Sequence, residues 1–178
     1  MRAKSQLRIV SGYLSGQLVD TPKTGATQPM GERERIAIFN QIRSYLPGAK
    51  VLDAFAGSGA LGITAISNGA DSVDFLEKNP EAIKAISANL KKHKCDNVSH
   101  IIKNVDQLKS YDLIFADPPY GNPQYDLVIK IAKTLKPGGI LVLSHPKTPQ
   151  PPELDDLRLL SDRSYAAACI KIYQKAEQ

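Results

Sequence analysis

The stretch DAFAGSGALG, residues 53–62, joins a short apolar run to a segment with helical character. The run KVLDAFAG, residues 50–57, has the length and the closing glycine of a buried strand. Gly57, Gly59 and Gly62 follow the pattern G-x-G-x-x-G where the strand gives way to the helix. The arrangement predicts a crevice for a nucleoside-containing ligand, although glycines also end strands for steric reasons alone.

Strand and helix signals alternate after this loop. Residues 60–69 are predicted as a helix that ends at Gly69, and residues 72–78 as the next strand. Asn79 is placed to cap a helix with Pro80 at its first position. Further strands are predicted at residues 97–102, 111–116 and 138–144, and a helix at about 124–135. The alternation predicts an α/β fold with a mostly parallel sheet covered on both faces.

The two ends of the chain depart from this alternation. Residues 7–19 have the pattern of a β-hairpin that turns around GYLSG, and residues 32–46 that of a helix. At the other end, a proline-rich loop leads into two further strands, with the last one antiparallel. We therefore expect an N-terminal extension over residues 1–48 and a main domain over residues 49–178.

Composition limits the possible classes of protein. The 178 residues, 42% of them hydrophobic, suffice for one sizeable core. The net charge of +5 permits a polyanionic partner. Cys95 and Cys169 lie far apart without CxxC spacing, so neither a metal site nor a disulfide scaffold is indicated. Because no signal peptide and no apolar run of roughly 18 residues is found, we expect a cytoplasmic protein without membrane contact.

Charge near the glycine loop separates two kinds of ligand. Asp53, four residues before Gly57, would repel the pyrophosphate of a dinucleotide. S-adenosylmethionine has no phosphate and carries cationic ammonium and sulfonium groups, which a carboxylate attracts. Glu77, twenty positions after Gly57, could accept hydrogen bonds from the ribose hydroxyls. Asn104 or Asp106 could accept one from the adenine amino group, unless both belong to an ordinary polar loop.

A second stretch, DLIFADPPYGNP at residues 112–123, ends a strand with an acid, two prolines and an aromatic ring. Ligands of such sheets lie at the carboxyl ends of the strands, so this stretch is expected beside the glycine loop. Pro118 and Pro119 stiffen the loop. An exocyclic amino group could donate to the Asp117 carboxylate and the Pro118 carbonyl, while Tyr120 stacks on the base. Otherwise the prolines merely stop the strand, and Tyr120 packs under a loop.

Methylation of an aromatic amine needs such acceptors, because the nitrogen lone pair is delocalised into the ring. Accepting the amine hydrogens concentrates electron density on the nitrogen and aims it at an activated methyl group. Positioning can be worth ~7–11 kcal/mol, whereas proton transfer typically contributes ~10²–10⁴-fold. Asp117 is therefore expected to act chiefly by orienting the amine. Stacking on Tyr120 is expected to add ~1–3 kcal/mol.

The segments VLDAFAGSGALG, DFLEKN and IFADPPYG, in this order and spacing, resemble the RsmD family of S-adenosylmethionine-dependent 16S rRNA guanine-N2 methyltransferases. LRIVSGYLSGQLVDTP and QPMGERERIAIFNQI extend the resemblance upstream. It implies a Rossmann-like methyltransferase sheet, a flipped guanine of 16S rRNA or of the small ribosomal subunit particle as target, and no metal; we expect a monomer. The implied contacts are Asp53, Gly57, Ser58 and Gly59 at the methionine end of the cofactor, Glu77 at the ribose, Asn104 at the adenine, and Asp117, Pro118, Pro119 and Tyr120 at the target base.

Two stretches depart from the family pattern. Gln28, Pro29 and Met30 stand where the family has Arg-Pro-Thr, and Ser144 and His145 replace an acid after the fifth strand. Both departures concern the substrate side more than the cofactor side.

The extension is basic. It holds seven Lys or Arg against three Asp or Glu, and Arg8, Arg33 and Arg35 are the expected phosphate contacts. Alternatively, Arg33 and Arg35 interleave with two glutamates on a solvated helix face.

Three functions remain open. The first is an rRNA guanine-N2 methyltransferase. The second is a DNA adenine or cytosine amino-methyltransferase, for whose usual target-reading domain this chain has no room. The third is a catalytically silent nucleic-acid-binding protein on a methyltransferase scaffold.

Overall fold

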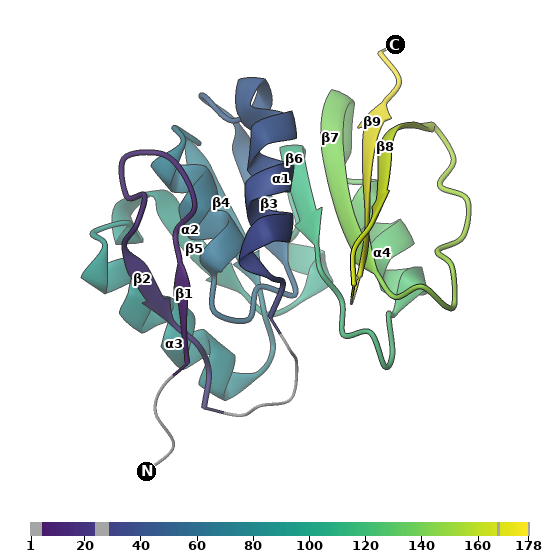
Figure 1. Ribbon diagram of the computed structural model, residues 1–178. Helices are drawn as coiled ribbons and strands as arrows, with labels where there is room; N and C mark the ends of the chain where they lie inside the picture. The colour runs from purple at the N-terminus through teal and green to yellow at the C-terminus, as the bar shows by residue number, and fades with distance from the viewer. Residues whose placement is uncertain (1–4, 24–28, 167, 178) are drawn as a thin grey trace.

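A seven-stranded sheet forms the centre of the computed structural model, which describes residues 5–23, 29–166 and 168–177 (Figure 1). The strand order is β5-β4-β3-β6-β7-β9-β8. The strands are β3 (Lys50–Ala54), β4 (Ser72–Leu76), β5 (Ser99–Ile102), β6 (Tyr111–Ala116), β7 (Leu135–His145), β8 (Leu157–Ser164) and β9 (Cys169–Lys175). The strands from β5 to β7 are parallel, and β9 is antiparallel to both of its neighbours. The predicted Rossmann-like sheet with an antiparallel end is confirmed.

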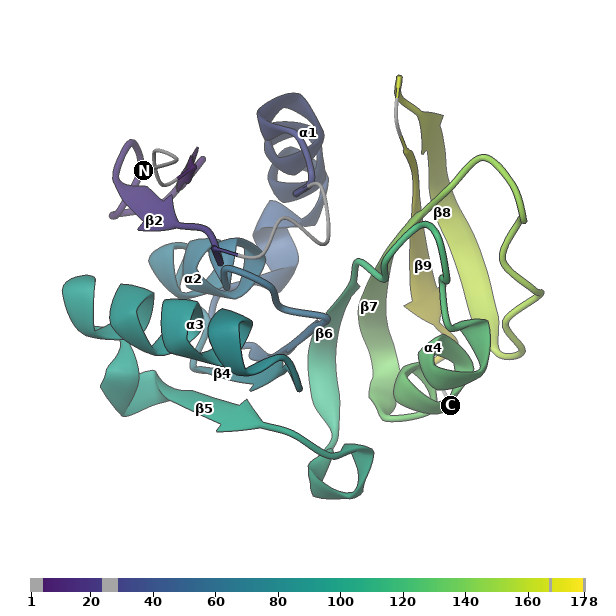
Figure 2. The same cartoon turned by 90° about the horizontal axis from the view of Figure 1, so that it is seen from below.

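Helices cover both faces of this sheet (Figure 2). They are α1 (Glu32–Ile42), α2 (Ala60–Ser67), α3 (Pro80–Lys92) and α4 (Tyr125–Ala132). Helices α1, α2 and α3 share one core with Val51, whereas α4 shares the other with Leu52. Neighbouring residues of a strand point to opposite faces of the sheet, and here both faces are covered. Both sets of side chains are therefore buried, which explains the continuous apolar runs in the sequence. Among the described helices, none is long and apolar enough to cross a membrane.

The starts of α2 and α3 follow from local sequence. Gly59 precedes α2 with a φ of 78°, a conformation that favours glycine. A Cβ at Gly62 would lie 2.3 Å from Cε1 of Phe75, so only glycine lets α2 approach the sheet this closely. The Asn79 side chain accepts a hydrogen bond from the N–H of Glu81 at 2.9 Å, which confirms the predicted cap.

The N-terminal hairpin packs against α2 and α3. Its strands are β1 (Gln6–Arg8) and β2 (Leu18–Asp20), paired antiparallel as predicted. The N–H of Leu14 donates to the hydroxyl of Ser67 at 2.8 Å. The Asn89 amide both accepts from and donates to the backbone of Asp20, at 2.9 Å each. These contacts join the extension to the main core, and the boundary between residues 48 and 49 stays a prediction.

Several element boundaries differ from the predicted ones. Helix α1 ends four residues earlier than predicted, followed by the 3₁₀ turn η1 (Arg43–Tyr45), and α4 is shorter at both ends. Strand β5 begins after the 3₁₀ turn η2 (Asp96–Val98). Strand β7 begins at Leu135, three residues earlier than predicted, because Leu135 pairs with Tyr111. The register then shifts before Leu113 pairs with Ile140, and Gly138 in this irregular stretch has a positive φ. Such irregular pairing leaves no periodic signal in the sequence.

Candidate active site

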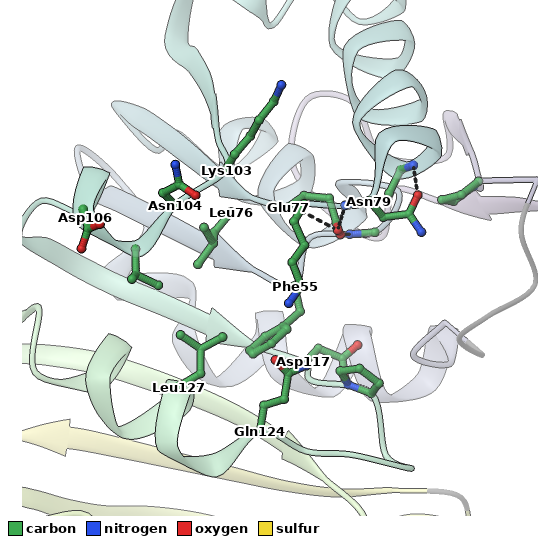
Figure 3. A pocket seen from close by; sticks show the side chains of 16 residues that line it. Phe55, Leu76, Glu77, Asn79, Lys103, Asn104, Asp106, Asp117, Gln124 and Leu127 are labelled. Carbon is green, nitrogen blue, oxygen red and sulfur yellow. Dashed lines mark hydrogen bonds between the residues drawn. The ribbon is translucent and has the colours of Figure 1, made fainter.

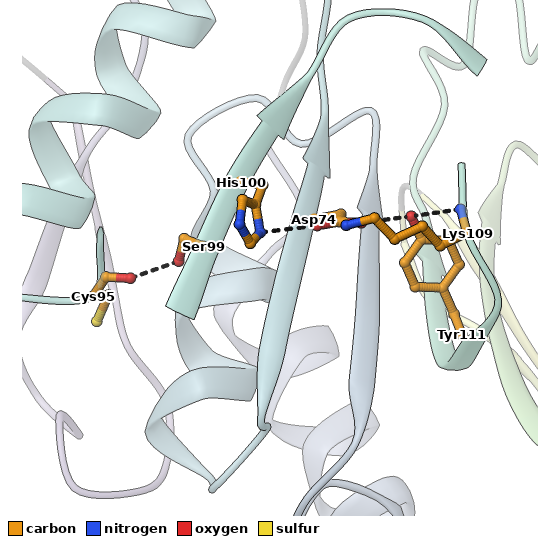
Figure 4. A network of polar contacts seen from close by, with 6 residues as sticks. All are labelled: Asp74, Cys95, Ser99, His100, Lys109 and Tyr111. Atoms are coloured by element: carbon orange, nitrogen blue, oxygen red, sulfur yellow. Dashed lines mark hydrogen bonds and ion pairs between the residues drawn. The ribbon is translucent and has the colours of Figure 1, made fainter. Parts of the chain in front are cut away.

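A cavity of about 570 Å³ opens at the carboxyl ends of the parallel strands (Figure 3). It is the place where sheets of this topology bind ligands. Its lining includes Phe55 and Gly57 after β3, Leu76, Glu77 and Lys78 at the end of β4, Lys103, Asn104, Val105 and Asp106 after β5, Asp117 and Pro119 after β6, and Gln124 and Leu127 at α4. The structure thus brings the two sequence motifs to one cavity.

The glycine loop is a tight turn with unusual backbone angles. Gly57 has a φ of 57°, and Phe55 has a φ of 61°, which is rare for a residue with a side chain. The N–H groups of Phe55 and Ala56 both donate to the carbonyl of Leu76, at 3.1 and 3.3 Å. These bonds hold the turn against β4 and place the Phe55 ring in the cavity lining. Backbone strain of this kind costs of order 1–3 kcal/mol and concentrates at functional sites.

Glu77 is fixed by backbone donors from the glycine loop and from the residues that follow it in the chain. One carboxylate oxygen accepts from the N–H of Gly57 at 3.0 Å, and the other from the N–H groups of Lys78 and Asn79 at 2.9 Å each. A carboxylate has about four acceptor positions, so capacity remains for a hydroxyl. The predicted ribose contact of Glu77 stays a prediction.

Asp53 lies at the end of β3, as the sequence suggested, but it does not line the cavity. It is 1% exposed beneath the glycine loop, where its carboxylate accepts from the N–H of Gly62 at 2.8 Å. Burial raises the pKa of Asp53 well above its ordinary value, and the nearby Asp117 and Glu77 carboxylates raise it further. A raised pKa favours the uncharged form of this carboxyl, so Asp53 repels a pyrophosphate less than the sequence analysis assumed.

The rest of the glycine loop is largely enclosed. Ser58 and Gly59 are buried, and the Ser58 carbonyl accepts from the Asn89 amide at 2.9 Å. Neither residue belongs to the cavity lining, in contrast to Gly57. Their predicted contacts with the cofactor stay predictions.

Asn104 and Asp106 both line the cavity, at the 3₁₀ turn η3 (Val105–Gln107). Asn104 caps this turn: its side chain accepts from the backbone of Gln107, whose side chain in turn accepts from the Asn104 N–H at 3.2 Å. The Asp106 side chain makes no comparable cap and lies exposed at the cavity edge. The choice between the two residues stays open in the structure.

The residues after β6 combine a desolvated acid with a fixed aromatic ring. Burial raises the pKa of Asp117 to about 6, and a hydrogen bond from Ser144 opposes this rise. The Tyr120 hydroxyl lies 2.5 Å from the Ser144 hydroxyl, and burial together with the Asp117 charge raises the pKa of Tyr120 to about 12. Pro118 is buried, and Pro119 lines the cavity.

The three arginines proposed from the sequence separate in the structure. Arg8 and Arg33 are exposed, and Arg8 lies 4.0 Å from a carboxylate oxygen of Glu32. Arg35 is 2% exposed, and its guanidinium donates to the carbonyls of Arg8 and Met30. The prediction that Arg35 contacts RNA is therefore wrong, because its buried guanidinium bonds helix α1 to the hairpin.

Some lining residues were missed by the sequence analysis. Lys78 and Lys103 each lie just past the end of a strand. Because ligands of such sheets bind at the carboxyl ends of the strands, this position could have been predicted from the strand boundaries. Leu127 and the left-handed Phe55 carried no such signal. Within the described parts of the chain, no group of three or more His, Cys, Asp or Glu could hold a metal ion.

A parallel sheet with a glycine loop after one of its strands binds nucleoside-containing ligands at this edge. The protein belongs to the class of S-adenosylmethionine-dependent methyltransferases. The family model described as Conserved hypothetical protein 95 matches residues 7–174. The chain is thus a member of this family, which is the RsmD family indicated by the sequence resemblance.

Curated relatives and solved structures agree with this membership. Ribosomal RNA small subunit methyltransferase D of Haemophilus influenzae is 27% identical over 97% of this chain and 95% of its own length. The protein of that name from Escherichia coli is 29% identical over 65% of this chain and 61% of its own length. The solved structure of yhhF from Escherichia coli, described as a candidate methyltransferase, has a TM-score of 0.86 at 22% identity and covers 98% of this chain and 100% of its own. At this identity, the likeness to yhhF supports the fold.

Proposed function

We propose that the protein transfers the methyl group of S-adenosylmethionine to the exocyclic N2 amino group of a guanine in 16S rRNA. The observation that carries the proposal is that Glu77, fixed by the glycine loop, and Asp117, at the end of β6, line one cavity. The names of the Haemophilus influenzae and Escherichia coli relatives support small-subunit rRNA as the substrate.

On the substrate side, the Asp117 carboxylate and the Pro118 carbonyl accept the two amine hydrogens and direct the nitrogen lone pair toward the cofactor. When bound, S-adenosylmethionine would supply an electrophilic methyl group and would leave as S-adenosylhomocysteine. The proton that the methylated amine releases would pass to the Asp117 carboxylate that accepts its hydrogen bond. With a pKa of about 6, Asp117 is largely ionised at neutral pH, as an acceptor must be. Tyr120, held by its hydroxyl, offers a ring face on which the flipped base stacks.

On the cofactor side, Glu77 holds the ribose and Gly57 contacts the methionine end. Asp53, Ser58 and Gly59 lie buried behind Gly57 and hold the loop in place. Leu76, Val105 and Leu127 supply apolar lining. We assign the adenine amino group to the turn η3, where the side chains of Asn104 and Asp106 both line the cavity and can each accept a hydrogen bond.

The basic extension over residues 1–48 contacts the RNA backbone through Arg8 and Arg33, and Lys78 and Lys103 add positive charge at the cavity. In this function the protein acts in the cytoplasm as a monomer on free 16S rRNA or on the small ribosomal subunit particle.

Methyl transfer from labelled S-adenosylmethionine tests the proposal. The substrates are unmodified 16S rRNA, free and in assembled subunits, with DNA as a competitor, and nucleosides of the product are identified by mass spectrometry. N2-methylguanosine at one site is the expected product. Label in DNA adenine or cytosine would instead establish a DNA amino-methyltransferase, and tight cofactor binding without transfer to any of these substrates would contradict the assigned substrate.

A further inference from the structure

Ser144 lies beside the proposed catalytic acid, although it is 27 positions away in sequence. Strands β6 and β7 are parallel, with Ala116 opposite Leu143. Asp117 follows the end of β6, and Ser144 follows Leu143 within β7. The register therefore places these two residues side by side. Ser144 is 1% exposed, and water therefore does not compete for its hydroxyl.

The Ser144 hydroxyl has two partners. It lies 2.5 Å from the Tyr120 hydroxyl. On its other side, the strand register puts it next to Asp117, whose pKa it lowers as a hydrogen-bond donor would. A serine carries one hydroxyl proton, and an ionised carboxylate can only accept. Ser144 must then donate to Asp117, and Tyr120 must donate to Ser144. The three groups form a directed chain from phenol to hydroxyl to carboxylate.

We propose that Ser144 is a positioning residue, which fixes the amine acceptor Asp117 and the stacking ring of Tyr120 relative to each other through this chain of hydrogen bonds. The proposal rests on the proposed function, since it gives a role to the same site. Holding one side of the Asp117 carboxylate restricts rotation of the group, and the remaining acceptor positions can face the amine. Holding the phenol fixes the ring plane on which the base stacks.

Removal of the hydroxyl should affect turnover more than binding. In Ser144→Ala, Asp117 loses a donor, and the Tyr120 hydroxyl loses its acceptor in a buried place. We expect kcat to fall by about 10- to 100-fold, corresponding to the usual cost of an unsatisfied buried group, with an unchanged Kd for S-adenosylmethionine. Ser144→Thr retains the hydroxyl and should recover most of the turnover. Tyr120→Phe keeps the ring and the bond from Ser144 to Asp117, so its effect should be smaller than that of Ser144→Ala.

The pH profile separates positioning from packing. A donor to the carboxylate favours its ionised form, so Ser144 lowers the Asp117 pKa from the value that burial alone would give. The acidic limb of the kcat profile should therefore move to higher pH in Ser144→Ala and stay nearly in place in Tyr120→Phe. A uniform loss of activity at every pH, with an unmoved limb, would show that Ser144 only fills space and would overturn the proposal.

A measurement without substrate keeps this inference distinct from the proposed function. The Asp117 carboxyl can be titrated by NMR in protein with ¹³C-labelled aspartate, with Asp117→Asn used to assign the signal. A higher titration midpoint in Ser144→Ala supports the chain of hydrogen bonds even if the wild-type protein fails to methylate rRNA. An unchanged midpoint contradicts it even if the wild-type protein is active.

Discussion

The two sides of the cavity hold their polar groups in different ways. On the cofactor side, backbone N–H groups fix the carboxylates: Glu77 accepts three of them, and Asp53 accepts one from Gly62. On the substrate side, a side-chain hydroxyl, that of Ser144, lies 2.5 Å from the Tyr120 hydroxyl and lowers the pKa of the neighbouring Asp117. The polar groups on the cofactor side are thus held by the main chain, which a substitution leaves in place. Those on the substrate side are held by a side chain, which a single substitution can remove.

This difference predicts separable effects. Substitutions on the substrate side should reduce turnover with little effect on cofactor affinity. Substitutions on the cofactor side should weaken cofactor affinity with little effect on turnover at saturating cofactor.

The largest effect is expected for Asp117→Ala. Because this change removes the acceptor that orients the amine, kcat should fall by at least about 10³-fold, in line with the contribution of orientation. The Kd for S-adenosylmethionine, measured by calorimetry, should change by less than about threefold, since Glu77 and the glycine loop remain. Substantial residual turnover would remove Asp117 from its assigned role.

Glu77→Gln should show the opposite pattern. The amide keeps the shape of the side chain but loses the charge, and one side of it presents a donor to backbone N–H groups. Cofactor affinity should weaken by about 10- to 100-fold, the range for a hydrogen bond to a charged group. At saturating cofactor, turnover should stay near that of the wild-type protein. An unchanged cofactor Kd would contradict the ribose contact.

The pH dependence of turnover should report Asp117. Its raised pKa of about 6 means that the acid keeps its proton to higher pH than an ordinary aspartate, and the protonated form cannot accept the amine hydrogen. Single-turnover rates should rise with pH and level off above about 7, with a loss of about tenfold at pH 5. In Asp117→Asn the residual rate should lack this acidic limb. A wild-type profile that is flat from pH 5 to 8 would contradict the assignment.

Gly62→Ala tests the close contact between α2 and the sheet. The new Cβ would lie 2.3 Å from Cε1 of Phe75 and 3.0 Å from an oxygen of Asp53, so the helix start must shift. We expect the free energy of unfolding to fall by about 1–3 kcal/mol, as in other overpacked cores. Gly121→Ala is the control, since a Cβ there meets nothing within 4 Å, and its effect should stay within about 0.5 kcal/mol. Equal denaturation midpoints for the two variants would argue against the steric account.

The smallest effect is expected from Arg33→Ala. Loss of one exposed phosphate contact should weaken rRNA binding a few-fold and reduce the slope of log K against log salt by about one. Arg158→Ala, on the edge strand β8, is the matched control and should leave this slope unchanged. If both variants behave alike in filter binding at several salt concentrations, the basic extension does not contact RNA.

The sequence predicted features that contiguous residues determine. The strand, glycine turn and helix around Gly57 were readable because spacing and backbone requirements lie within one segment, and the Asn79 cap was readable for the same reason. Features that depend on tertiary register were not. The burial of Arg35 and of Asp53, and the meeting of Ser144 with Asp117, arise only when distant segments pack together.

A crystal structure with bound S-adenosylhomocysteine would test the central claim most directly. We predict that a ribose hydroxyl bonds to Glu77, that the adenine lies near Leu76 and Asp106, and that the sulfur faces Asp117 across the cavity. A ligand bound elsewhere, or one whose sulfur faces away from Asp117, would contradict the claim that one cavity joins the cofactor to the amine acceptor.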